Sequence, residues 1–173
     1  MRAMASTETK TNWYALSVVP GREAEAAGLL GTCAMAPRAE FEYVKDGVRT
    51  SELRPMLPGL VLLEAADPAD ARRTCRRTNG LADLRVQKTR IDELSPEAAE
   101  TFRALCGQSG VAAFSEATMV DGVRVLSGAL TGHETLIGRV NSRRKCAYVP
   151  VDLGGQPAEL ELGLRVTRKG GAR

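Results

Sequence analysis

Apolar and polar positions along the N-terminal half predict alternating strands and helices. Residues 13–19 and 56–64 are mainly apolar runs, and each lies beside a Pro-Gly pair of the kind found in tight turns. These runs are typical of buried strands. Between them, residues 22–35 form a run that predicts a helix.

Two further helices are predicted by their capping residues. Asp67 is a favourable N-cap followed by proline at the first helical position, and this helix is expected to cover residues 68–78. Ser95 repeats the same signals before an apolar stripe, and Gly107 ends that helix.

The last third of the chain consists of short predicted strands punctuated by glycine. Strands are expected at residues 123–125, 136–140 and 147–151, with a polar tip at residues 141–145. A further strand follows Gly154-Gly155. Short strands of this kind are typical of small barrels.

The C-terminal pattern resembles the KOW motif of ribosomal proteins and NusG-type transcription elongation factors. The N-terminal order is a Trp-Tyr strand, a helix, a Leu-Pro-Gly strand, a helix and Thr-x-Gly, which resembles the N-terminal domain of NusG. The usual patterns of that domain are W-Y, F-P-G-Y-V and T-P-G-V. The two resemblances follow the family's own order and cover most of the chain.

The resemblance implies an α+β fold with two domains. We expect an N-terminal α/β sandwich of the NGN type, with an antiparallel sheet and helices, plus a small C-terminal SH3-like KOW β-barrel. The expected bounds are residues 11–106 for the polymerase-binding domain, 107–118 for a linker rich in small residues, and 119–170 for the barrel.

The resemblance also implies a partner for the N-terminal domain. In the family, residues beside the Pro-Gly turn and in the first strand form an apolar cavity that clasps the clamp helices of the RNA polymerase β′ subunit. Apolar strand residues are also the usual material of a core. The expected polymerase-binding residues are Trp13, Tyr14, Leu57, Pro58 and Leu60.

Four arginines on the helix at residues 68–78 form two adjacent cationic rows, since residues 72 and 76, like 73 and 77, are one turn apart. By resemblance, Arg72 and Arg73 are expected to meet the non-template DNA strand or the polymerase cleft. The alternative is a salt-bridged surface of the helix.

Positive charge is concentrated in the expected barrel. Residues 120–173 contain nine Lys/Arg and five Asp/Glu, a net charge of +4, whereas residues 1–119 contain fifteen and sixteen, a net charge of −1. Cations attract phosphate backbones, and because aromatic residues are few here, a structured RNA hairpin fits better than a stacked single strand. The alternative to RNA binding is that the basic residues form a solvated hairpin tip and that His133 is an exposed loop histidine. The expected RNA-binding residues are Thr131, His133, Arg139, Asn141, Ser142, Arg143, Arg144 and Lys145.

The barrel departs from the housekeeping NusG pattern G-P-F-x-x-F-x-G. Ala129 stands at the proline, His133 at the second aromatic and Thr135 at a glycine. The sequences Leu-x-Gly-His-Glu and Asn-Ser-Arg-Arg-Lys instead resemble LoaP, a specialised paralogue that acts in antitermination at long biosynthetic operons.

The leading hypothesis is therefore a processive antitermination factor that promotes read-through of terminators. A housekeeping NusG-like elongation factor and a KOW RNA-binding protein of ribosome assembly are the alternatives. The Trp-Tyr and Leu-Pro-Gly strands favour the two NusG-like hypotheses over the ribosome-assembly protein, because a ribosomal protein has no need of a polymerase-clasping domain.

Several other classes of function find no support in the sequence. His133 is the sole histidine, and no nucleotide-binding motif or nucleophile beside a base is present, so neither an enzyme nor a cofactor or metal is expected. Without an apolar run near the roughly 20 residues of a membrane helix, we expect a cytoplasmic monomer that has no contact with membranes. Four separated cysteines without a C-x-x-C pair are expected to be buried thiols, at Cys33, Cys75, Cys106 and Cys146.

Overall fold

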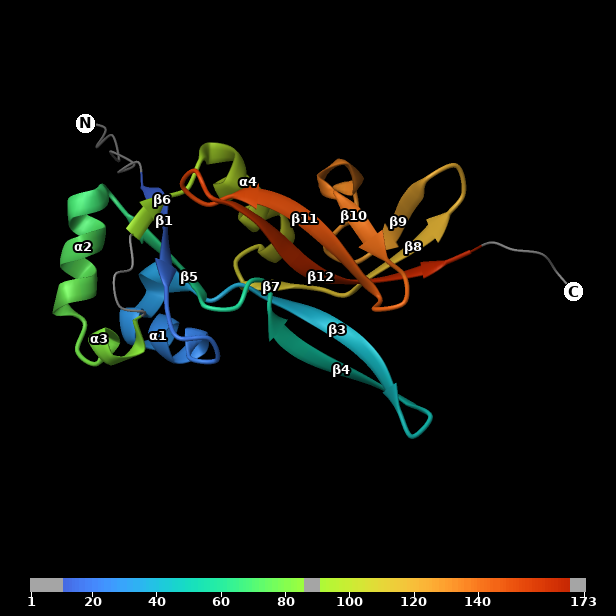
Figure 1. Ribbon diagram of the computed structural model, residues 1–173, viewed down its shortest axis with the longest axis horizontal. Coiled ribbons are helices and arrows are strands. Elements are labelled where there is room, and N and C mark those ends of the chain that lie inside the picture. Colours follow the sequence, from blue (N-terminus) through green and yellow to red (C-terminus); the bar gives the residue numbers. More distant parts are fainter. Residues whose placement is uncertain (1–10, 86–90, 169–173) are drawn as a thin grey trace, which may run out of the picture.

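The computed structural model describes residues 11–85 and 91–168 and has the expected α+β fold (Figure 1). An α/β sandwich forms the N-terminal part, and a small barrel of the SH3-like type forms the C-terminal part. The strands are β1 (Asn12–Ser17), β2 (Ala34–Met35), β3 (Arg38–Lys45), β4 (Val48–Pro55), β5 (Leu60–Ala65), β6 (Ile91–Glu93), β7 (Val111–Ala112), β8 (Ser115–Met119), β9 (Val123–Ser127), β10 (Arg139–Asn141), β11 (Cys146–Asp152) and β12 (Pro157–Thr167). The α-helices are α1 (Glu23–Leu30), α2 (Pro68–Arg77), α3 (Leu81–Leu84) and α4 (Pro96–Cys106), and the 3₁₀ helices are η1 (Gly31–Cys33) and η2 (Glu134–Leu136).

The N-terminal sheet is antiparallel and has the strand order β2-β5-β1-β6. Side chains alternate between its faces, as in any strand. On β1, Tyr14 and Leu16 point into an apolar cluster with residues of α1, α2 and α3. Ala15 belongs to a second cluster, which includes Phe102 of α4. The first strand therefore serves two cores, one on each side of the sheet.

The two capped helices are confirmed. The Asp67 carboxylate accepts a hydrogen bond from the Asp70 amide at 2.7 Å, and the Ser95 hydroxyl accepts one from the Ala98 amide at 3.1 Å. Each helix begins with proline, and α4 ends before Gly107 as expected. These signals are local, so they can be read without tertiary information.

The helix expected at residues 22–35 is shorter in the structure. It ends at Leu30 and is followed by η1 and β2. Ala34 and Met35 pair with Leu63 and Leu62 of β5, so the edge of the sheet takes over these residues. Backbone pairing to a neighbouring strand overrides the local helical pattern here.

The hairpin of β3 and β4 was not anticipated, and its tip extends away from the rest of the chain (Figure 1). Lys45 pairs with Val48 across a loop of two residues, Asp46 and Gly47, whose φ angles are 52° and 78°. Asp-Gly between residues of this kind is a strong hairpin signal, because both loop positions of this turn require positive φ.

The C-terminal sheet has the order β10-β11-β12-β8-β9. The strand expected at residues 136–140 begins only at Arg139, because residues 134–136 form η2. The segment at residues 107–118, expected to be a linker, contains β7 and most of β8. Pairing explains this difference: β7 joins β3 and β8 joins β12, both in parallel register.

The barrel packs directly on the N-terminal part. Strand β12 lies beside β3, and the Glu161 amide donates a hydrogen bond to the Met56 carbonyl at 3.0 Å. Arg165 pairs with Glu42 of β3 at 3.1 Å and also with Glu116 of β8. Phe102 and Leu160 belong to one continuous apolar cluster. The two parts therefore share a core.

Other sequence expectations concern thiols, metals and membranes. All four cysteines are free; Cys33 is half-buried and the others are buried. Burial raises the pKa of the Cys106 thiol to about 12. Within residues 11–85 and 91–168, no three His, Cys, Asp or Glu side chains cluster as metal ligands would, and no helix is long and apolar enough to cross a membrane.

Candidate functional site

The expected polymerase-binding residues on β1 lie on opposite faces of the sheet. Trp13 is half-buried and packs at the edge of the cluster on the α4 side. Tyr14 is 0% exposed and lies in the cluster beneath α1 and α2. The structure therefore does not bring Tyr14 to the surface that contains Trp13.

The Leu-Pro-Gly sequence forms a tight turn at residues 57–60. The Leu60 amide donates to the Leu57 carbonyl at 3.3 Å, and Gly59 has a φ of 80°, which fits a type II turn with proline at its second position. Leu57 is half-buried and Pro58 is exposed. Leu60 is only 5% exposed and belongs to the cluster shared with the barrel. Leu57 and Pro58 are thus the accessible side chains of the turn.

Glu23 holds this turn through hydrogen bonds to backbone amides, and it is not among the site residues predicted from the sequence. Its carboxylate accepts hydrogen bonds from the Gly59 amide at 2.7 Å and from the Gly21 amide at 2.9 Å. Burial alone would raise the pKa of this carboxyl group, but the backbone hydrogen bonds outweigh it and the pKa is lowered. The sequence signal that points to Glu23 is the presence of an acidic residue in the first turn of a helix, where the helix dipole favours negative charge.

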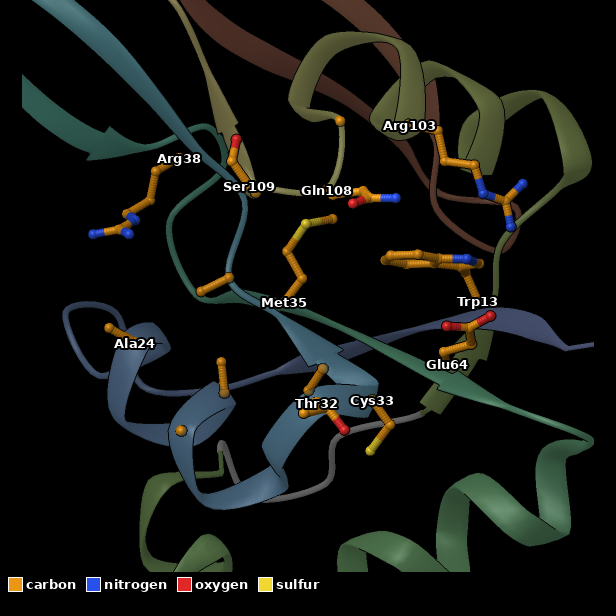
Figure 2. Close-up of a pocket in the computed structure, with 16 residues that line it drawn as sticks. Trp13, Ala24, Thr32, Cys33, Met35, Arg38, Glu64, Arg103, Gln108 and Ser109 are labelled. Atoms are coloured by element: carbon orange, nitrogen blue, oxygen red, sulfur yellow. The ribbon is translucent and has the colours of Figure 1, made fainter.

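An open groove of about 830 Å³ lies beside Trp13 (Figure 2). One wall comes from α1, η1 and β2, and the other comes from the end of α4 and the segment that follows it. Small side chains dominate the first wall, and Met35 projects into the space between the walls. The groove is lined by Trp13, Ala24, Ala27, Gly28, Thr32, Cys33, Ala34, Met35, Ala36, Arg38, Glu64, Arg103, Gly107, Gln108, Ser109 and Gly110.

Trp13 lies between two charged groups at one end of the groove. Figure 2 shows Arg103 above the indole and Glu64 below it, and the guanidinium carbon is 5.6 Å from the ring centre. The Glu64 carboxylate accepts a hydrogen bond from the Thr11 hydroxyl. Within the described part of the chain, the buried Trp13 Nε1 has no hydrogen-bond partner. The groove therefore has a mixed lining, with small and apolar side chains on the α1 wall and charged or polar side chains, among them Arg103 and Gln108, on the other.

The arginines of α2 form an exposed surface that is only partly paired. Arg73 lies 3.0 Å from Asp70, and the Arg72 Nε donates to the Pro68 carbonyl at 3.1 Å. Arg76 and Arg77 have no ion pair within the described ranges. Most of the positive charge of this helix is therefore not neutralised by its own neighbours.

The basic tip of the barrel is also partly neutralised. Arg139 makes two hydrogen bonds to Glu159, at 2.8 and 3.1 Å, and stacks 3.5 Å from the Tyr148 ring centre. Arg144 lies 3.4 Å from Glu161. Among residues that the structure describes, Arg143 and Lys145 have no ion pair. They are the cations of this tip with charge available to a ligand.

The small polar residues of the expected RNA site shape its turns. The Asn141 side chain accepts a hydrogen bond from the Arg144 amide at 3.1 Å, and the Thr131 hydroxyl donates to the Gly128 carbonyl at 2.9 Å. Ser142 is exposed. His133 is half-buried and precedes η2, so β10 separates it from the tip. Along the chain, η2 and β10 therefore lie between the histidine and the basic tip.

Comparison with known proteins identifies the family of the N-terminal part. The family model described as "Transcription termination factor nusG" matches residues 11–103, which are 93 of the 173 residues. No curated protein matches the chain. A solved structure described as "Domain interaction in Thermotoga maritima NusG" is 14% identical, with a TM-score of 0.47, over 90% of this chain and 94% of that chain. Because the family model spans more than half of the sequence, this chain belongs to the NusG family of transcription factors.

Proposed function

We propose that the chain is a specialised NusG-family elongation factor that acts in processive antitermination. The N-terminal part binds the clamp helices of the RNA polymerase β′ subunit, and the barrel binds a structured RNA hairpin. Together these contacts promote read-through of terminators in long biosynthetic operons, as the resemblance to LoaP implies. Arg72 and Arg73 contact non-template DNA or the polymerase cleft.

The groove beside Trp13 is the observation that carries the polymerase contact. An amphipathic helix binds by laying its apolar side chains into such a groove, with polar groups at the rim. The walls consist mainly of small side chains, so a helix backbone can approach closely, and Arg38 and Arg103 stand at the rim. Leu57 and Pro58 of the turn at residues 57–60 add accessible apolar side chains on the same N-terminal part.

The buried position of Leu60 narrows the surface that a partner can reach. Leu60 packs in the cluster that also contains Val149 and Leu160 of the barrel. A partner helix can therefore reach the half-buried Trp13 and Leu57 and the exposed Pro58, but not the buried Leu60.

RNA binding is supported by two cations of the tip, Arg143 and Lys145, which have no ion pair within residues 11–85 and 91–168. Phosphate contacts depend on charge that neighbouring side chains have not already neutralised. Arg139 contributes less, because it would have to leave Glu159 and Tyr148. The tip is therefore a small cationic loop suited to a phosphate backbone.

Ala24→Glu tests the polymerase contact, because Ala24 is an exposed residue of α1 that lines the groove. A carboxylate at this position would have to be desolvated against an apolar helix, so affinity for an isolated β′ clamp-helix fragment should fall by at least about tenfold, or about 1.4 kcal/mol. Ala82→Glu is the matched control, since Ala82 is an exposed residue of α3 outside the groove lining. Equal affinity of the two variants, measured by calorimetry with both folded, would refute the assignment.

A further inference from the structure

Glu23 connects two turns that are far apart in sequence. It is the first residue of α1 and is 6% exposed. One carboxylate oxygen accepts the Gly59 amide at 2.7 Å, and the other accepts the Gly21 amide at 2.9 Å. Both oxygens are therefore used to hold backbone of the N-terminal part.

Gly59 is fixed through both of its backbone polar groups. Its amide binds Glu23, and its carbonyl accepts a hydrogen bond from the Val18 amide at 2.8 Å. Its φ is 80°, and a Cβ at this position would lie 2.9 Å from the Val18 carbonyl oxygen. Only glycine fits this conformation without strain. The hydrogen bonds to Glu23 and to Val18 hold the turn in place.

Loss of the carboxylate would leave a buried amide without an acceptor. An unsatisfied buried donor costs about 1–3 kcal/mol, so the turn would shift to bring the Gly59 amide to water. Such a shift moves Leu57 and Pro58, because they belong to the same turn. The buried Glu23 carboxylate thus determines the positions of the accessible side chains of Leu57 and Pro58.

We propose that Glu23 is a positioning residue for polymerase binding, which holds the turn at residues 57–60 in the conformation that the clamp helix recognises. This inference rests on the proposed function, because the turn belongs to the surface assigned to the polymerase. A preformed contact increases affinity, since no ordering of the turn is needed when the partner binds. Glu23 itself does not touch the partner.

The chain offers a matched pair of substitutions. Alanine at position 23 removes both acceptor oxygens, so the buried Gly59 amide loses its partner. Glu25 lies on the same helix, is exposed, and pairs with Arg22 at 2.6 Å. Glu25→Ala therefore removes an acid from α1 without touching the turn.

The test is titration of a purified β′ clamp-helix fragment into the full-length wild type, Glu23→Ala and Glu25→Ala. The temperature should lie well below the unfolding midpoint of all three proteins. Glu23→Ala should weaken binding by at least about tenfold, whereas Glu25→Ala should stay within about twofold of the wild type. A merely structural role would lower the unfolding temperature of Glu23→Ala and leave its affinity unchanged, and that result would overturn the proposal.

A second measurement does not depend on how the variant folds. Amide hydrogen exchange in the wild type should show Gly59 protected to the same degree in the free chain and in the complex, because the turn is preformed. Protection that develops only on binding would contradict the inference. If the wild type does not bind the fragment at all, the proposed function fails, and this inference fails with it.

Discussion

Single residues determine how closely the barrel approaches the N-terminal part. Gly163 lies on β12 where this strand meets β3, and a Cβ there would be 2.2 Å from the Glu40 carbonyl oxygen and 2.5 Å from the Phe114 ring. Neither neighbour can give way without moving backbone or a packed ring. The absence of a side chain at this position thus permits the contact between the two parts.

Two glycine-to-alanine substitutions should change stability in opposite directions. Gly163→Ala forces strands apart and should lower the free energy of unfolding by about 2 kcal/mol, the usual range for overpacking. Gly28 lies in α1 and a Cβ there would meet nothing within 4 Å. Gly28→Ala should therefore raise stability by about 0.5–1 kcal/mol. Urea denaturation measures both effects, and shifts of the same sign would contradict this account.

Because of Glu23, the free energy of unfolding should depend on pH in the acid range. Its carboxyl pKa in the folded chain lies below the ordinary value of 4.5, so the carboxylate stabilises the fold fully above that pH. The contribution is lost as pH falls through the lower, folded value. The difference in unfolding free energy between the wild type and Glu23→Gln should therefore narrow below pH 4.5. A constant difference across the acid range would exclude this linkage.

At the scale of elements, local sequence signals were sufficient to predict the helices whose N-terminal amides are capped by a neighbouring side chain. Asp67 and Ser95 were assigned as caps from neighbouring residues alone, and both make the expected hydrogen bond. The hairpin of β3 and β4 is not among the elements predicted from the sequence, although its Asp-Gly loop is an equally local signal. The helix expected at residues 22–35 was too long, because the edge of β5 recruits Ala34 and Met35.

Removal of one cap should weaken α4 by a modest and measurable amount. Ser95→Ala leaves the Ala98 amide without its acceptor and should cost about 1 kcal/mol. Ser95→Asp retains an acceptor and places negative charge at the helix N-terminus, so it should restore most of the loss. Thermal unfolding followed by circular dichroism compares the variants. Equal melting of Ser95→Ala and the wild type would show that the cap contributes nothing.

At the scale of the whole molecule, the barrel and the sandwich share one apolar cluster. Leu60 and Phe102 come from the N-terminal part, and Leu160 comes from β12. Arg165 adds an ion pair to Glu42 of β3. Leu60, a residue of the Leu-Pro-Gly turn, is buried in this shared cluster.

Because one apolar cluster spans the sandwich and the barrel, the full chain should unfold in one cooperative transition. Differential scanning calorimetry should give a single peak whose calorimetric and van't Hoff enthalpies agree. Gly163→Ala should broaden or split this peak, because it acts where the two parts meet. Two resolved transitions in the wild type would show that the parts unfold independently.

The sequence by itself determined the family, the fold class and the capped helices, because these depend on motifs and hydrogen bonds between residues close in the chain. Tertiary structure decided which candidate residues are available. Pairing with Glu159 occupies Arg139, the alternation of β1 turns Tyr14 away from Trp13, and Leu60 is buried in the cluster that the sandwich and the barrel share. It also revealed Glu23 as the support of a turn 36 residues away. Such roles depend on contacts between distant segments, and composition and local pattern do not encode which segments meet.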